Sequence, residues 1–200
     1  MKRIITVSRE FGSGGRELGR RLSELLHIAY YDKEIVTEIA KRTSMSEEYV
    51  RQITEQKPVM SFPISIGRSF YPMTDPLLDQ NQAIFREQHQ IIREMADKSD
   101  CVIVGRCGDY ILRDLNPFRI FVYADMDAKI ARCRERGKED PPLSDKELKQ
   151  KITKMDKGRA KYYEFYTGQK WGDRLNYDVC INTSGRSITE LAAVLVRLVN

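Results

Sequence analysis

The chain has 200 residues, enough for one domain of ordinary size with a substantial core. Hydrophobic residues make up 41% of it and charged residues 32%, which is typical of a soluble globular protein. No apolar run approaches the roughly 20 residues of a membrane span, and the N-terminus lacks the apolar region of a secretory signal. We therefore expect a cytoplasmic protein without a membrane partner.

The net charge of +5 indicates an anionic partner, either nucleic acid or a small phosphorylated ligand. Basic residues are interspersed with acids, as in "RCRERGKED", which favours a solvated mixed-sign surface and argues against nucleic acid. The four cysteines form no CxxC pair, and only His27 and His89 could join them as ligands. We therefore expect neither a zinc site nor a disulfide framework.

Strand and helix patterns alternate along the whole chain. The apolar runs predict strands at 4–7, 28–32, 101–104, 120–123 and 177–182. Helical spacing predicts helices from about residue 16 to 26, after Asp32, from the capping box at 44–47, and over 77–95, 127–136, 144–162 and 187–199. Residues 57–76, with four prolines, interrupt the pattern and predict an irregular functional segment.

Three local signals support these helices. Leu18, Leu22, Leu25 and Leu26 fall at i, i+4, i+7 and i+8, the stripe of a helix packed on a sheet. Asp32 can cap the next helix, and Ser144 with Glu147 forms a second capping box.

Apolar strands separated by helices predict an α/β fold of three layers, with a central parallel sheet covered on both faces. Ligands of such folds bind beyond the carboxyl ends of the strands.

The stretch "SREFGSGGRELG" follows the first strand and opens the first helix. Gly12, Gly14 and Gly15, with Ser13 between them, lack the Cβ atoms that would keep backbone N–H groups from converging on an anion. The helix that begins near Arg16 directs its positive dipole end to the same place. The alternative is a turn needed only for close packing of strand and helix. The position and density of the glycines favour phosphate binding.

The loop departs from the full phosphate-loop pattern GxxxxGK[ST]. In one alignment Glu10 holds the place of the first glycine, Arg16 that of the lysine and Glu17 that of the hydroxyl residue. Arginine can supply the positive charge with a forked geometry suited to phosphate. Glu17 could hold Mg²⁺, directly or through water, or could be a solvated residue of the first helical turn.

The segment "IITVSREFGSGGRELGRRLSELLHIAYYDKE" resembles the opening of the cytidylate-kinase-like family, a branch of the nucleoside monophosphate kinases. Without gaps, Gly12 and Gly14 fall on the family's loop glycines, and Asp32 falls on an acceptor-side aspartate. In that register the lysine position is Gly15, one residue before Arg16. The two alignments of the loop therefore differ by one residue.

Three further stretches carry the resemblance. In "VIVGRCGDYILRD", Arg106 matches an arginine that holds the acceptor's phosphate. In "FRIFVYADMDAKIARCRER", Arg132 matches an arginine that reaches the transferring phosphoryl group. In "KMDKGRAKYYEFYTG", Asp156 and Arg159 match an Asp/Arg set on the far side of the lid, although a surface ion pair is the ordinary alternative.

Two positions depart from the family. Cys107 stands where it has aspartate, and Glu38 stands where it has an arginine for the acceptor phosphate. The resemblance is therefore weakest on the acceptor side.

The resemblance implies a single P-loop kinase domain over 1–200, of the P-loop nucleoside-triphosphate-hydrolase type. An acceptor-binding insertion at about 33–98 and a lid at about 134–162 would complete it. The implied reaction is phosphoryl transfer from ATP, with Mg²⁺, to a nucleoside monophosphate, with CMP or dCMP first among the acceptors. A kinase of another small metabolite and a non-catalytic nucleotide-binding or nucleic-acid-binding protein are the alternatives.

Overall fold

Five parallel strands form the centre of the protein, in a computed structural model that describes residues 2–55, 76–136 and 143–199. The strands are β1 (Ile4–Arg9), β2 (Ala29–Tyr31), β3 (Cys101–Val104), β4 (Phe118–Tyr123) and β5 (Val179–Asn182). Their order across the sheet is β2-β3-β1-β4-β5, so β1 lies at the centre. Because all strands are parallel, their carboxyl ends share one edge.

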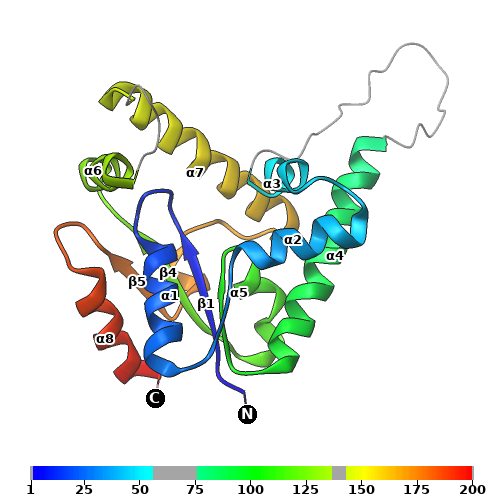
Figure 1. Cartoon of the computed structure of the whole chain (residues 1–200), viewed down its shortest axis with the longest axis horizontal. Helices are drawn as coiled ribbons and strands as arrows, with labels where there is room; N and C mark the ends of the chain where they lie inside the picture. The colour runs from blue at the N-terminus through cyan, green and yellow to red at the C-terminus, as the bar shows by residue number, and fades with distance from the viewer. Residues whose placement is uncertain (1, 56–75, 137–142, 200) are drawn as a thin grey trace.

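Helices cover both faces of this sheet (Figure 1). They are α1 (Gly15–Leu26), α2 (Lys33–Thr43), α3 (Glu47–Glu55), α4 (Pro76–Lys98), α5 (Gly108–Ile111), α6 (Met126–Arg136), α7 (Asp145–Thr167) and α8 (Ile188–Val199). The 3-10 turns η1 (Arg113–Leu115) and η2 (Arg174–Asn176) complete the described elements. The predicted three-layer α/β fold is confirmed. No helix within the described ranges is both long and apolar enough to cross a membrane.

The sheet separates two hydrophobic cores, because successive side chains of a strand point to opposite faces. Ile5 and Val7 of β1 pack with Leu18 and Leu22 of α1 and with helix α8. Ile4, by contrast, belongs to the core formed with α2, α4, α5 and α7. Burial on both faces explains why the strands read as continuous apolar runs.

Two details of the predicted helices are wrong. Leu25 is 49% exposed, because the buried face of α1 centres on Leu18 and Leu22 and leaves Leu25 at its margin. Ser44 does not open a helix; it closes α2 in a left-handed conformation, and Ser46 accepts a hydrogen bond from the Tyr49 N–H to begin α3.

The second predicted capping box is confirmed at the start of α7, where Ser144 and Glu147 bond each other's backbone N–H groups. Helix α5 and η1 are too short to produce a periodic signal, and the sequence did not predict them. The irregular segment lies outside the described residues except for Pro76, which begins α4, and the "GKEDPP" stretch at 137–142 also lies outside them. The acceptor-binding insertion and the lid therefore stay predictions.

Candidate functional site

A cleft of about 670 Å³ opens at the carboxyl edge of the sheet, within the range of roughly 300–1,000 Å³ usual for small-molecule sites. Its charges are strongly unequal. The described residues that line it include nine basic ones, Arg9, Arg16, Lys33, Arg51, Arg106, Arg132, Arg136, Lys151 and Arg159, against the acidic pair Glu10 and Asp32. This excess of positive charge suits a ligand with several negative charges.

The loop between β1 and α1 forms one wall of the cleft. Gly12 and Gly14 have positive φ angles of 76° and 83°, a conformation that side chains other than glycine's rarely adopt. Gly14 is the N-cap of α1, and no side chain caps this helix end. The N–H groups and the positive dipole end of α1 therefore face the cleft without a side chain of the cap covering them.

Close packing also requires these glycines. A Cβ atom on Gly12 would lie 3.0 Å from Cys133 Sγ, and one on Gly14 would lie 2.8 Å from Ile188 Cδ1. The two interpretations of the loop, tight packing and phosphate binding, are thus compatible. Ser13 is a buried residue of the loop, and its carbonyl accepts a hydrogen bond of 2.6 Å from Thr183 Oγ1.

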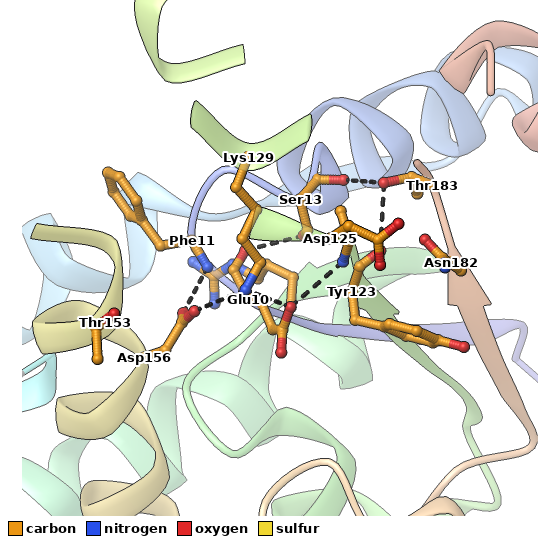
Figure 2. A network of polar contacts seen from close by, with 12 residues as sticks. Glu10, Phe11, Ser13, Tyr123, Asp125, Lys129, Thr153, Asp156, Asn182 and Thr183 are labelled. Atoms are coloured by element: carbon orange, nitrogen blue, oxygen red, sulfur yellow. Dashed lines mark hydrogen bonds and ion pairs between the residues drawn. The ribbon is translucent and has the colours of Figure 1, made fainter. Parts of the chain in front are cut away.

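Behind the loop, Figure 2 shows an acid–lysine–acid contact that we call the brace, formed by Glu10, Lys129 and Asp156. Lys129 Nζ lies 2.5 Å from Glu10 Oε2 and 3.0 Å from Asp156 Oδ2. Asp156 also accepts a hydrogen bond of 2.6 Å from the Phe11 N–H, and Glu10 accepts one of 3.3 Å from the Ala124 N–H. The brace therefore ties the loop to α6 and α7.

Arg16 and Asp32, both predicted site residues, bind each other. Arg16 Nε lies 2.6 Å from Asp32 Oδ2, and half of the Arg16 side chain is exposed. Asp32 occupies the N-cap position of α2 but makes no side-chain capping bond, so the predicted cap is wrong. Its carboxylate is instead buried in the cleft, 3.6 Å from Arg9 Nη2.

Glu17, the candidate Mg²⁺ contact, faces two arginines. Its carboxylate lies 2.8 Å from Arg21 Nη2 and also pairs with Arg136. Burial alone would raise the pKa of Glu17, but these two hydrogen-bonded arginines hold it below its usual value. Among the described residues, no group of three or more His, Cys, Asp or Glu side chains is arranged to hold a metal ion.

The three other predicted arginines all line the cleft. Arg106 is buried in a left-handed conformation two residues after the end of β3, and its guanidinium donates to Thr54 Oγ1. Arg159 donates to the Arg9 carbonyl at 3.3 Å and lies over the Phe11 ring. Arg132 donates to the Thr183 carbonyl at 2.5 Å, and its buried Nη1 has no hydrogen-bond partner among the described residues.

The cleft thus brings together most of the predicted residues: Gly12, Gly14, Gly15, Arg16, Asp32, Arg106, Arg132 and Arg159. The other three do not line it. Ser13 is buried within the loop, Asp156 binds the Phe11 N–H from α7, and Glu17 lines a neighbouring depression.

Sequence reasoning missed Arg9 and Lys129. Arg9 ends β1 and is 8% exposed, and Lys129 is 5% exposed. Burial lowers the pKa of Arg9 to about 9, with Arg159 adding to the effect and Asp32 opposing it. The polar residues after Val7 concealed Arg9, because they read as the end of the strand. Lys129 had a usable signal, since it lies three residues before Arg132 and shares its helix face.

Comparison with known proteins identifies the family of this chain. The model of the cytidylate kinase-like family matches residues 4–185. The chain belongs to this family. A cytidylate kinase of Methanopyrus kandleri is 24% identical over 204 residues, which cover 96% of this chain and 90% of the relative. The resemblance predicted from the loop and the three later stretches is therefore confirmed, and family membership supports a kinase-type phosphotransferase.

Solved structures agree on the fold. An uncharacterized protein from Eubacterium ventriosum superposes with a TM-score of 0.71 at 29% identity, covering 99% of this chain and 98% of the other. Shikimate kinase from Acinetobacter baumannii, solved in complex with shikimate, superposes with a TM-score of 0.55 at 15% identity, covering 100% and 93%. At that low identity the second likeness concerns the fold alone.

The brace predicts a large stability effect from one lysine. Replacing Lys129 by Met leaves two partly buried carboxylates without their cation, so the free energy of unfolding should fall by about 2 kcal/mol. Lys154→Met, on the exposed side of α7, should change it by less than about 0.5 kcal/mol. Urea unfolding at pH 7 measures both, and equal stabilities for the two variants would contradict the role of the brace.

The brace also predicts a pH dependence. Burial lowers the pKa of Lys129, but Glu10 and Asp156 more than offset it, so the pKa is raised overall. A raised pKa stabilises the fold fully below the ordinary lysine value of about 10.4, and the effect is lost as pH rises through the folded-state value. The stability difference between wild type and Lys129→Met should therefore be constant from about pH 6 to 9 and shrink only above about pH 10.4.

Proposed function

We propose that this protein transfers the γ-phosphoryl group of ATP to a nucleoside monophosphate, with CMP and dCMP as the first candidates. The observation that carries the proposal is the cleft, where nine basic residues face two acids beside the N-terminus of α1. Phosphoryl transfer demands such a site, because its transition state spreads negative charge over several oxygens and is stabilised mainly by fixed positive groups. Family membership supports the same reaction class.

On the donor side, the backbone from Gly12 to Gly15 and the first turn of α1 would bind the phosphates of ATP. Arg16 adds positive charge at the mouth of the loop, anchored by Asp32. Mg²⁺ would be held mainly by the phosphates of the nucleotide, as is usual for this ion, and would neutralise part of their charge. Glu17 is the nearest predicted protein contact for it, although two arginines already bind this carboxylate.

At the transferring group, Arg132 and Arg159 would act from two different helices. Arg132 extends from α6 and Arg159 from α7, and each is oriented by a backbone carbonyl. The fixed orientation matters, because donors that need no rearrangement stabilise developing charge best. Asp156 would act as a positioning residue, since it holds the Phe11 N–H and the Lys129 ammonium.

The acceptor would bind between Asp32 and Arg106. Glu38, which replaces the family's acceptor arginine, pairs with Arg42 at 3.1 Å and does not line the cleft. Lys33 and Arg51 do line it and are the further cations available to an acceptor phosphate. A different set of cations on this side would allow a different acceptor, so a kinase of another small metabolite is the second candidate.

A panel of acceptors tests the proposal. ATP and Mg²⁺ are supplied with CMP, dCMP, UMP, AMP or shikimate, and ADP release is followed by a coupled assay. We expect turnover with a pyrimidine nucleoside monophosphate that exceeds ATP hydrolysis in the absence of acceptor. Turnover with shikimate alone would favour the second candidate. ATP binding without transfer to any acceptor would favour a non-catalytic binding protein.

Two arginines of α6 provide a matched comparison. Arg132→Met should lower kcat on the order of 10²-fold, the usual effect of removing one fixed donor to the transition state. Arg134→Met should leave kcat within about threefold, because Arg134 is exposed and its ion pair with Asp145 lies at the surface. Equal kcat values for the two variants, at equal melting temperature, would contradict the assignment of Arg132.

A further inference from the structure

In the glycine loop, a glycine and a basic residue have exchanged places relative to the full phosphate-loop pattern. In the full pattern GxxxxGK, the first glycine lies five residues before the second, and the lysine follows the second directly. With Gly14 as the second glycine, the lysine position is Gly15 and the first-glycine position is Arg9. A glycine thus stands where the pattern has a cation, and a cation stands where it has a glycine.

These two positions share one space. An ideal Cβ atom on Gly15 would lie 2.4 Å from Arg9 Cβ and 3.0 Å from Arg9 Cγ. Contacts of this length between carbon atoms do not occur without rearrangement. The stem of Arg9 therefore fills the volume in which a side chain at position 15 would begin, and the two side chains exclude each other.

The far end of Arg9 is accommodated by a second glycine. Gly105, in the turn after β3, has a φ of +73°, and a Cβ on it would lie 1.7 Å from Arg9 Nη1. From there the guanidinium faces Asp32, with Nη2 3.6 Å from Oδ1. Because Gly15 and Gly105 have no side chains, they leave space for the buried side chain of Arg9. Its guanidinium thereby reaches the part of the cleft between the glycine loop and Asp32.

The charge at this point is not balanced by Asp32. The same carboxylate binds Arg16 at 2.6 Å, so one negative charge serves two guanidinium groups. Arg159 and Arg106 lie near enough to lower the pKa of Arg9 further, in addition to the effect of burial. Burying a charge in such surroundings is costly. A bound anion would offset that cost.

We propose that Arg9 replaces the lysine of the full phosphate loop and binds an oxygen of the phosphoryl group in transfer. This inference rests on the proposed function. During transfer, the bond between the γ-phosphorus and the β–γ bridging oxygen breaks, and its electron pair stays on that oxygen. An oxygen of the acceptor's phosphate supplies the pair for the new bond. Arg9 stays protonated and donates hydrogen bonds, whose forked geometry suits two phosphate oxygens.

Substitutions of Arg9, compared with one of Arg16, test this role. Turnover is measured by kinetics, and binding of ATP and of inorganic tripolyphosphate is measured by titration calorimetry. Arg9→Met keeps the length of the side chain and removes its charge. It should lower kcat on the order of 10²-fold and weaken binding of both anions about tenfold, and Arg9→Lys should recover part of each loss. The comparator Arg16→Met should lose less than Arg9→Met. A larger loss in Arg16→Met would overturn the assignment in favour of Arg16.

The exchange itself is tested by restoring the full pattern. Gly15→Lys alone should lose activity and anion binding, because the lysine stem collides with Arg9. The double variant Arg9→Gly/Gly15→Lys should bind tripolyphosphate at least about tenfold more tightly than Gly15→Lys. A double variant no better than Gly15→Lys would overturn the proposal, and this comparison stands even if Arg9→Met fails to fold.

The binding measurements separate this inference from the proposed function. If wild type transfers phosphate to no acceptor, the proposed function fails, while the loss of anion binding in Arg9→Met still supports Arg9 as a phosphate ligand. If wild type is an active kinase and a folded Arg9→Met binds ATP and tripolyphosphate as wild type does, the role of Arg9 is overturned and the proposed function stands.

Discussion

Mutual repulsion among arginines at the carboxyl ends of β1 and β3 is the constraint on which the site depends. Burial lowers the pKa of Arg9 there, Arg159, Arg106 and Arg16 lower it further, and Asp32 is the carboxylate between Arg9 and Arg16. The space left at Gly15 and Gly105 orients Arg9, and the Arg9 carbonyl helps to orient Arg159. Such fixed positive charge lowers the stability of the fold, and it stabilises an anion that binds in the cleft.

The brace concerns negative charge near the same site. Acidic side chains near a phosphate site would repel the ligand, yet Glu10 and Asp156 are needed to hold the Ala124 and Phe11 N–H groups. Lys129 contacts both carboxylates and offsets part of their negative charge. Glu10, which also lines the cleft, and Asp156 are therefore paired with Lys129, while Arg9 and Arg16 share Asp32. Because the brace joins α6 and α7, it also fixes the helices that carry Arg132 and Arg159.

Much of this was open to prediction from sequence. The parallel sheet follows from apolar runs between helices, and the cleft follows from the shared carboxyl edge, so Arg106 and Asp32 could be placed there. The direction in which a long side chain points could not be predicted from the sequence. Arg16 turns to Asp32, and Arg9 enters the cleft through the space left by two glycines that lie 90 residues apart in the chain (Gly15 and Gly105). Contacts of this kind depend on tertiary packing, which periodicity does not encode.

The most direct test is a crystal structure with a bisubstrate analogue that joins two nucleosides through a polyphosphate chain. We predict that the chain crosses the cleft from the loop to Asp32, with phosphate oxygens about 2.7–2.9 Å from nitrogen atoms of Arg9 and Arg132. A polyphosphate bound outside this cleft, or one bound within it while Arg9 still faces only Asp32, would contradict the central claim that the arginines at the carboxyl edge form a phosphoryl-transfer site.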